Sequence, residues 1–226
     1  ADDFQAWRES LTKIRSGQRL LDAILEPKNA SEMVSRLSVD DFHYMVHRIG
    51  MEDSEQVLAL AAGEQVRGLL DCDGWSRDQI EMDRLDPWLN ALMRSGPEHL
   101  TRHLLALDDV MLTYILTQSC RVKVVDEPDD FDPPDVEHTF TPDGRLCIMF
   151  PESAARDLPI KVFLDYMTRR NPVFCFNLLV MSIPALRSNL EEEAYRWRSG
   201  RMADLGYVDY YDALNIYVPP RRDSAP

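Results

Sequence analysis

The chain has 226 residues, of which 45% are apolar and 28% charged, and its 25 basic against 39 acidic side chains give a net charge of −14. This is the composition of an ordinary globular protein, and it excludes collagen-like, disulfide-framework and bulk-disordered chains. The strong negative charge argues against nucleic acid or an anionic membrane surface as the main partner, because phosphate binding depends on Lys and Arg.

The first residues, Ala1 to Gln5, do not have the form of a secretory leader, because they are acidic and no apolar run follows them. The nearest candidate for a membrane span, Val173 to Ile183, is shorter than the roughly 18 apolar residues that such a helix needs. The four cysteines are scattered without a C-x-x-C pair. We therefore expect a cytoplasmic protein with reduced thiols and no membrane insertion.

Apolar residues recur with helical spacing between Leu11 and Arg121, and the pattern is interrupted at short intervals. One apolar stripe consists of Phe42, Met45, Val46 and Ile49. Ser38 before it is expected to cap the start of the helix, and Gly50 after it is expected to end the helix. Residues 1–122 are therefore predicted to form a helical region of short antiparallel helices, either a superhelical array or a bundle.

Two details of this region are expected from local signals. Ser76 and Gln79 have the spacing of a capping box and predict the start of a longer helix that contains Trp88. Pro87 within that pattern marks either the first position of a second helix or a residue inside one helix. The acidic pair Asp108 and Asp109 suits a helix N-terminus.

Residues 123–150 differ in character and are predicted to form an acidic loop followed by a β-hairpin insertion. Val122, Val124 and Val125 suit a short strand, and the acidic, proline-rich stretch 126–137 resists packing. The turn triplet 142–144 separates two β-rich segments, 138–141 and 145–150, which predicts the hairpin.

Helical spacing returns after this insertion, so residues 151–218 are predicted to form a C-terminal helical region and residues 219–226 a disordered tail. The last long helix is expected from about Asn189 to Leu205, with Gly206 ending it. Gly200 inside this helix suggests either a close helix contact or a local break. The predicted fold class is therefore mainly α, with a small β-hairpin insertion.

Two histidine pairs at i, i+4 are the clearest candidates for a metal site, namely His43 with His47 and His99 with His103. This spacing places both imidazoles on one face of a helix, where a carboxylate or a third histidine from elsewhere would complete a divalent-metal site. The alternative is that these histidines are solvated or packed at the edge of the core. The segment 71–74 resembles the opening of a calcium loop but fails its spacing, so we interpret it as a turn.

The acidic stretch 126–137 is interpreted as a solvated linker, with weak binding of hard cations as the alternative. A second group, Arg196, Trp197, Arg198 and Arg201, lies in a helix where Arg and Trp suit a partner- or anion-binding patch. The alternative is a structural network of ion pairs, for example Glu192 with Arg196 and Arg201 with Asp204.

The sequence contains no P-loop, no G-x-G-x-x-G and no G-x-S-x-G motif, and no nucleophile stands in a recognisable catalytic setting. The segments 192–201, 204–207 and 17–25 resemble a bacterial family known as domain of unknown function 6178, over residues from about Ser16 to Tyr217. That resemblance implies no activity and no catalytic residues. Residues 20–120 show a weaker similarity, in helix rhythm and leucine placement, to the superhelical cytosolic N domain of MgtE magnesium transporters, which would imply a part in sensing the cation.

The leading hypothesis from these observations is a non-enzymatic helical scaffold without a cofactor that presents an acidic surface to another protein. The alternative is a sensor or enzyme that depends on a divalent metal and uses a histidine pair or the acidic loop. Nucleic acid is not expected as a partner, and the sequence leaves the oligomeric state open.

Overall fold

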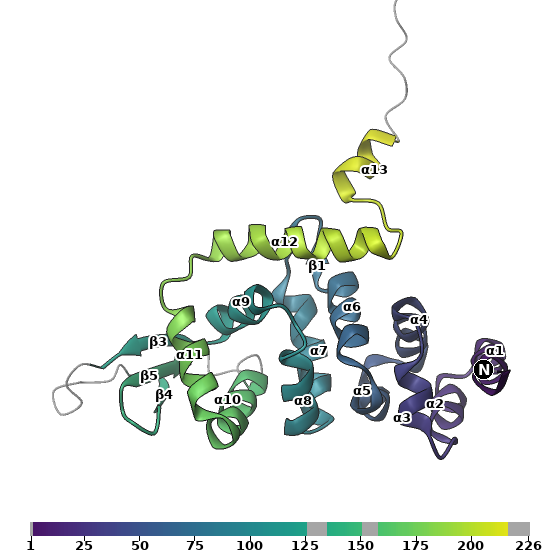
Figure 1. Ribbon diagram of the computed structural model, residues 1–226, viewed down its shortest axis with the longest axis horizontal. Coiled ribbons are helices and arrows are strands. Elements are labelled where there is room, and N and C mark those ends of the chain that lie inside the picture. Colours follow the sequence, from purple (N-terminus) through teal and green to yellow (C-terminus); the bar gives the residue numbers. More distant parts are fainter. Residues whose placement is uncertain (1, 126–134, 151–157, 217–226) are drawn as a thin grey trace, which may run out of the picture.

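A computed structural model describes residues 2–125, 135–150 and 158–216 of the chain. These residues form thirteen α-helices, one short 3-10 helix and two small antiparallel sheets. The prediction of a mainly α fold is confirmed, and the packing is consistent with a bundle of short helices (Figure 1). The stretch 126–134, which is most of the predicted acidic loop, and the predicted tail 219–226 lie outside the described residues.

Six helical elements form the N-terminal end of the row of helices in Figure 1, and they are α1 (Asp2–Lys13), α2 (Gly17–Leu25), α3 (Ala30–Ser35), α4 (Val39–Ile49), the 3-10 helix (Met51–Asp53) and α5 (Glu55–Leu60). The hydroxyl of Ser38 accepts a hydrogen bond from the amide of Asp41 and so caps α4, as predicted. Gly50 has φ +100°, a conformation that favours glycine, and ends this helix. The apolar stripe of α4 is fully buried.

The chain continues through α6 (Gly63–Asp73), β1 (Trp75–Ser76), β2 (Gln79–Ile80) and α7 (Met82–Arg94). The predicted capping box at Ser76 and Gln79 is wrong, since these residues pair across a two-stranded hairpin. Arg77 takes φ +60° in the turn, and the helix begins only at Met82. Pro87 lies inside α7, so that stretch is one helix.

Helices α8 (Pro97–Leu104) and α9 (Asp109–Ser119) complete the first helical part. Asp108 caps α9, because its carboxylate accepts a hydrogen bond from the amide of Met111 at 2.8 Å. The acidic start predicted for this helix is therefore confirmed.

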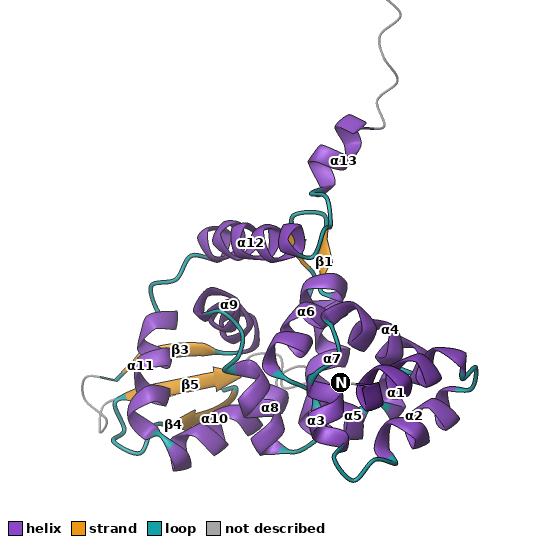
Figure 2. Ribbon diagram, turned by 45° about the vertical axis from the view of Figure 1, so that its right-hand side comes forward, coloured by secondary structure: helices purple, strands orange, loops and turns teal. Residues whose placement is uncertain are grey.

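Strands β3 (Arg121–Val124), β4 (Glu137–Phe140) and β5 (Leu146–Phe150) form a sheet in which β5 lies between the other two. The predicted hairpin is confirmed: β4 and β5 pair antiparallel, with His138 opposite Met149. Gly144 has φ +70° in the turn between them. Helices α10 (Leu158–Arg170) and α11 (Pro172–Ser182) lie beside this sheet (Figure 2).

The long helix α12 (Arg187–Asp204) crosses the bundle over α9 and the hairpin β1–β2 (Figures 1 and 2). Gly206 has φ +87°, and its amide and that of Tyr207 donate to the carbonyls of Ala203 and Met202, both at 2.9 Å. These bonds form a Schellman motif, which confirms Gly206 as the predicted stop. Helix α13 (Tyr210–Ile216) follows and projects away from the body of the molecule (Figure 1).

The buried apolar side chains form one continuous cluster that runs from Phe4 in α1 to Ala194 in α12. Ala194 is the one fully buried residue of α12, so apolar burial attaches this helix only weakly. No single helix among the described residues is long and apolar enough to cross a membrane. Taken together, α11 and α12 reach the length and apolar composition of a membrane span, and the chain bends by 113° between these two helices.

Candidate functional site

One of the two predicted histidine pairs meets a carboxylate. His43 and His47 lie one turn apart on α4, and Asp73 is the last residue of the neighbouring helix α6. The Nε2 atom of His43 is 2.9 Å from Oδ1 of Asp73, and Nε2 of His47 is 2.7 Å from Oδ2. One ligand atom from each of the three residues lies within 4.8 Å of the others. Two imidazoles and one carboxylate therefore converge on one point.

The surroundings of Asp73 favour positive charge. The carboxylate lies at the C-terminus of α6, where the helix dipole disfavours a negative group. Burial alone would raise its pKa, but the hydrogen bonds and charges of His43 and His47 outweigh burial and lower the pKa. The ring of His47 packs edge-on against Trp88, with 5.6 Å between the ring centroids, which holds this imidazole in place.

The second histidine pair has a different environment. His103 is buried, and its Nε2 donates to the carbonyl of Leu58 at 2.9 Å. Burial, with a smaller contribution from the charge of Arg102, lowers the pKa of His103 to about 4, so this imidazole is neutral at physiological pH. Among the described residues, the group of His43, His47 and Asp73 is the one that brings three potential metal ligands together, and neither His99 nor His103 belongs to it.

Two arginines of the predicted partner- or anion-binding patch, Arg198 and Arg201, point toward the body of the protein. The Nε and Nη2 atoms of Arg201 donate to both oxygens of Asp71 at 2.6 and 2.9 Å, and Nη1 donates to Asp108 at 3.1 Å. Burial opposes the charge of Arg201, but Asp71 and Asp108 outweigh burial and raise its pKa. Arg198 donates to the backbone carbonyl of Asp71 at 2.7 Å and lies over the ring of Trp75. Arg201 therefore pairs with distant carboxylates and not with Asp204 as expected.

The other two members of the predicted patch face solvent. Arg196 forms the expected i, i+4 ion pair with Glu192, and Trp197 is 56% exposed. Both line a groove of about 500 Å³ along α12, together with Asn189 and Glu193. Gly200, on the same helix, has no heavy atom within 4 Å of the position that a Cβ would take. The helix is unbroken there, so the close contact or break expected at this glycine is absent.

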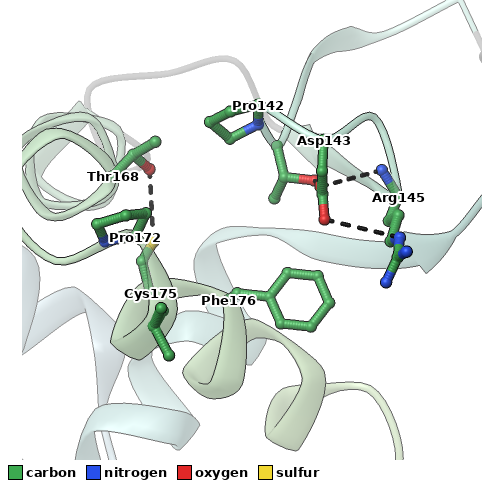
Figure 3. A pocket seen from close by; sticks show the side chains of 9 residues that line it. Pro142, Asp143, Arg145, Thr168, Pro172, Cys175 and Phe176 are labelled. Atoms are coloured by element: carbon green, nitrogen blue, oxygen red, sulfur yellow. Dashed lines mark hydrogen bonds and ion pairs between the residues drawn. The ribbon is translucent and has the colours of Figure 1, made fainter.

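A further pocket, of about 360 Å³, lies between the β4–β5 turn and helices α10 and α11 (Figure 3). Asp143 and Arg145 line it on the side of the turn, and Thr168 and Cys175 lie opposite, with their oxygen and sulfur 3.5 Å apart (Figure 3). Burial raises the pKa of the Cys175 thiol, which leaves this cysteine a poor nucleophile.

Asp73 is the site residue that the sequence analysis did not single out. The turn expected at 71–74 is wrong for its first three residues, since Asp71 to Asp73 form the end of α6 and Gly74 follows the helix. One signal was available in the sequence: Asp71 and Asp73 place two carboxylates in the last turn of a helix, where basic residues are usual. Nothing in the sequence indicated which residues would neutralise them.

Comparison with known proteins assigns a family but no activity. The model of a Family of unknown function (DUF6178) matches residues 3–225, nearly the whole chain. No curated protein and no solved structure matches the chain, so the similarity of residues 20–120 to the MgtE N domain has no support from them. The mainly α chain with its His43, His47 and Asp73 cluster thus belongs to the Family of unknown function DUF6178.

Proposed function

We propose that this protein is a cytoplasmic, non-enzymatic helical scaffold that binds another protein through its C-terminal helices. The observation that carries the proposal is the distribution of exposed apolar side chains. Of twenty large apolar or aromatic side chains that are exposed in the described part of the chain, fifteen lie at or after Leu158. Exposed apolar side chains that gather on one part of a protein are typical of interaction sites.

Helix α13 is the most exposed part of this surface. The hydroxyl of Tyr211 donates to Asp78 at 3.0 Å, and the guanidinium of Arg77 lies over the ring of Tyr210, so the first turn of α13 is attached to the β1–β2 hairpin. Leu214 is 48% and Ile216 67% exposed. A short helix that is attached at one end and apolar at the other fits recognition in which a helix inserts into a groove of its partner.

The net charge of the chain indicates the charge that its partner should carry. A net charge of −14 repels a second acidic copy and attracts a protein with basic residues around an apolar groove. Trp197 adds a large aromatic side chain of the kind that dominates binding energy at interfaces, and the exposed Arg196 lies next to it.

Site-specific photo-crosslinking in living cells tests this proposal. A photoreactive residue is placed at Leu214, at Trp197 and, as a control, at Tyr44, which is 52% exposed on α4. We expect one defined adduct from the two C-terminal positions and none from Tyr44, and we expect Ile216→Asp to abolish the adduct without lowering the unfolding midpoint. Equal adducts from all three positions, no adduct, or an adduct with the mass of two copies of this chain would refute the proposal.

A second candidate, a divalent-metal-dependent sensor or enzyme, is supported by one specific observation. The cluster of His43, His47 and Asp73 provides three ligands of the kind that transition metals prefer. Turnover of a small molecule that requires metal and stops in His47→Gln would favour this candidate over the scaffold.

A further inference from the structure

Asp71 and Asp73 both lie in the last turn of α6, and their carboxylates have different partners. Asp71 is neutralised by the guanidinium of Arg201, which binds both of its oxygens. Among the described residues, Asp73 forms its ion pairs with His43 and His47 alone. A neutral imidazole carries no charge, so Asp73 lies at the negative end of α6 without a permanent positive partner.

The three side chains offer two imidazole nitrogens and one carboxylate oxygen, which are ligands typical of first-row metal ions such as Zn²⁺. Imidazole nitrogen suits Zn²⁺, Ni²⁺, Cu²⁺ and Fe²⁺, and a single carboxylate beside two imidazoles is common in such sites. Mg²⁺ and Ca²⁺ prefer oxygen ligands, of which this cluster has only the two of Asp73. The donor set therefore selects a transition metal and excludes the hard cations.

We infer that His43, His47 and Asp73 form a Zn²⁺-binding site with one coordination position open to solvent. The inference goes beyond the proposed protein-binding function and does not depend on it. The two Nε2 atoms and one oxygen of Asp73 bind the ion, and each imidazole then carries its proton on Nδ1. The ion thus replaces the Nε2 protons that His43 and His47 donate to the carboxylate of Asp73.

The positions of the ligands require little movement. Donor atoms around a tetrahedral Zn²⁺ lie about 3.4 Å apart, given metal–ligand bonds of about 2.1 Å. The two Nε2 atoms lie 2.9 and 2.7 Å from the oxygens of Asp73, slightly less than this spacing, and all three donor atoms lie within 4.8 Å of one another, so small side-chain rotations bring them to coordination distances. The side chains of His43, His47 and Asp73 are 30%, 47% and 20% exposed, which leaves a path for the ion and room for a water ligand.

The helices that carry the ligands are rigidly packed. The opposite face of α4 buries Phe42, Met45 and Val46, and α4 packs directly against α6. Trp88, buried in α7, packs edge-on against the ring of His47. A metal ion bound here joins α4 to the end of α6 and stabilises the folded chain over the unfolded one.

Titration of the full chain without an affinity tag tests the site, because a histidine tag would itself bind zinc. Calorimetry after removal of metal with a chelator should show one Zn²⁺ per chain. Substitution by Co²⁺ should give the intense visible absorption of a four-coordinate ion, and neither Mg²⁺ nor Ca²⁺ should compete. His47→Gln and Asp73→Asn should each weaken binding by more than about tenfold, the effect that even an outer-shell change causes.

His138→Ala serves as the matched control, since His138 is exposed on β4 and joins no group of three potential metal ligands among the described residues. This variant should bind Zn²⁺ as the unchanged chain does. Failure of the unchanged chain to bind Zn²⁺, or equal binding by His47→Gln and the unchanged chain, overturns the inference. His47 is half exposed, so this variant keeps the test decisive even where Asp73→Asn impairs folding.

Discussion

Arg201 and Asp71 form a bidentate ion pair across 130 positions of sequence, with Nε and Nη2 donating to the two carboxylate oxygens at 2.6 and 2.9 Å. The side chain of Asp71 is only 4% exposed. α12 buries only Ala194 completely, and this ion pair attaches it to α6 together with the hydrogen bond from Arg198 to the carbonyl of Asp71. A charge-assisted, bidentate contact fixes both the position and the rotation of the helix.

Replacement of Arg201 by alanine is expected to destabilise the chain strongly. Removing one partner leaves the carboxylate of Asp71 buried and unpaired, which costs about 3 to 5 kcal/mol of unfolding free energy. Urea denaturation measures this loss, and hydrogen exchange should show that residues 187–204 lose protection first. Arg196→Ala is the matched control, because its exposed pair with Glu192 contributes less than about 1 kcal/mol. Equal losses in the two variants would contradict the role of Arg201.

Gly200→Ala is expected to stabilise the chain. Gly200 lies in the middle of α12 in exposed, open space, so alanine adds helix propensity without a clash. The gain in unfolding free energy is about 1 kcal/mol. Gly206→Ala is the contrasting control, since φ +87° disfavours any L side chain and the same substitution there should cost about 1 kcal/mol. Thermal unfolding of both variants checks the two signs.

The stability of the protein is expected to fall between about pH 6.5 and pH 4 because of His103. Its pKa of about 4 in the folded chain lies below the ordinary 6.5, so the unfolded chain binds the proton more tightly. The stabilisation by neutral His103 is complete above pH 6.5 and is lost as the pH falls through that range, by up to about 3 kcal/mol.

His103→Gln provides the control for this pH dependence. Its amide can donate to the carbonyl of Leu58 as Nε2 of His103 does, but it does not titrate. Denaturation curves at several pH values should show a shallower slope in the variant between pH 4 and 6.5. An unchanged slope would assign the pH dependence to other groups.

Gln65 is expected to be essential for the packing of α6. The side chain is completely buried, its Nε2 donates to the carbonyls of Val34 and Leu37 at 2.7 and 2.8 Å, and its Oε1 accepts from the amide of Ala62. Gln65→Met has a similar volume but removes the hydrogen bonds to the carbonyl of Leu37 and the amide of Ala62, while the carbonyl of Val34 keeps the amide of Leu37 as a donor. We expect a loss of about 2 to 4 kcal/mol in urea denaturation. Gln56→Met, at an exposed position of α5, should cause little change.

Local features of the fold were predictable because their causes lie within a few residues. Ser38 and Gly50 bound α4, and Gly144 and Gly206 adopt the positive φ angles of their turn and helix stop. Capping bonds and left-handed glycines depend on the immediate neighbours, so the sequence pattern suffices. The two-residue strands β1 and β2 were missed, because strands this short have no recognisable alternation.

The amino-acid sequence by itself determined the mainly α class, the helix boundaries at strong caps and the β4–β5 hairpin. Only the tertiary structure decided which charged groups meet across elements that lie far apart in the sequence. Arg201 pairs with Asp71, 130 residues away, and not with Asp204, because a buried carboxylate gains more from a cation than a solvated one does. His43 likewise meets Asp73, 30 residues away, since the packing of α4 on α6 places their side chains face to face.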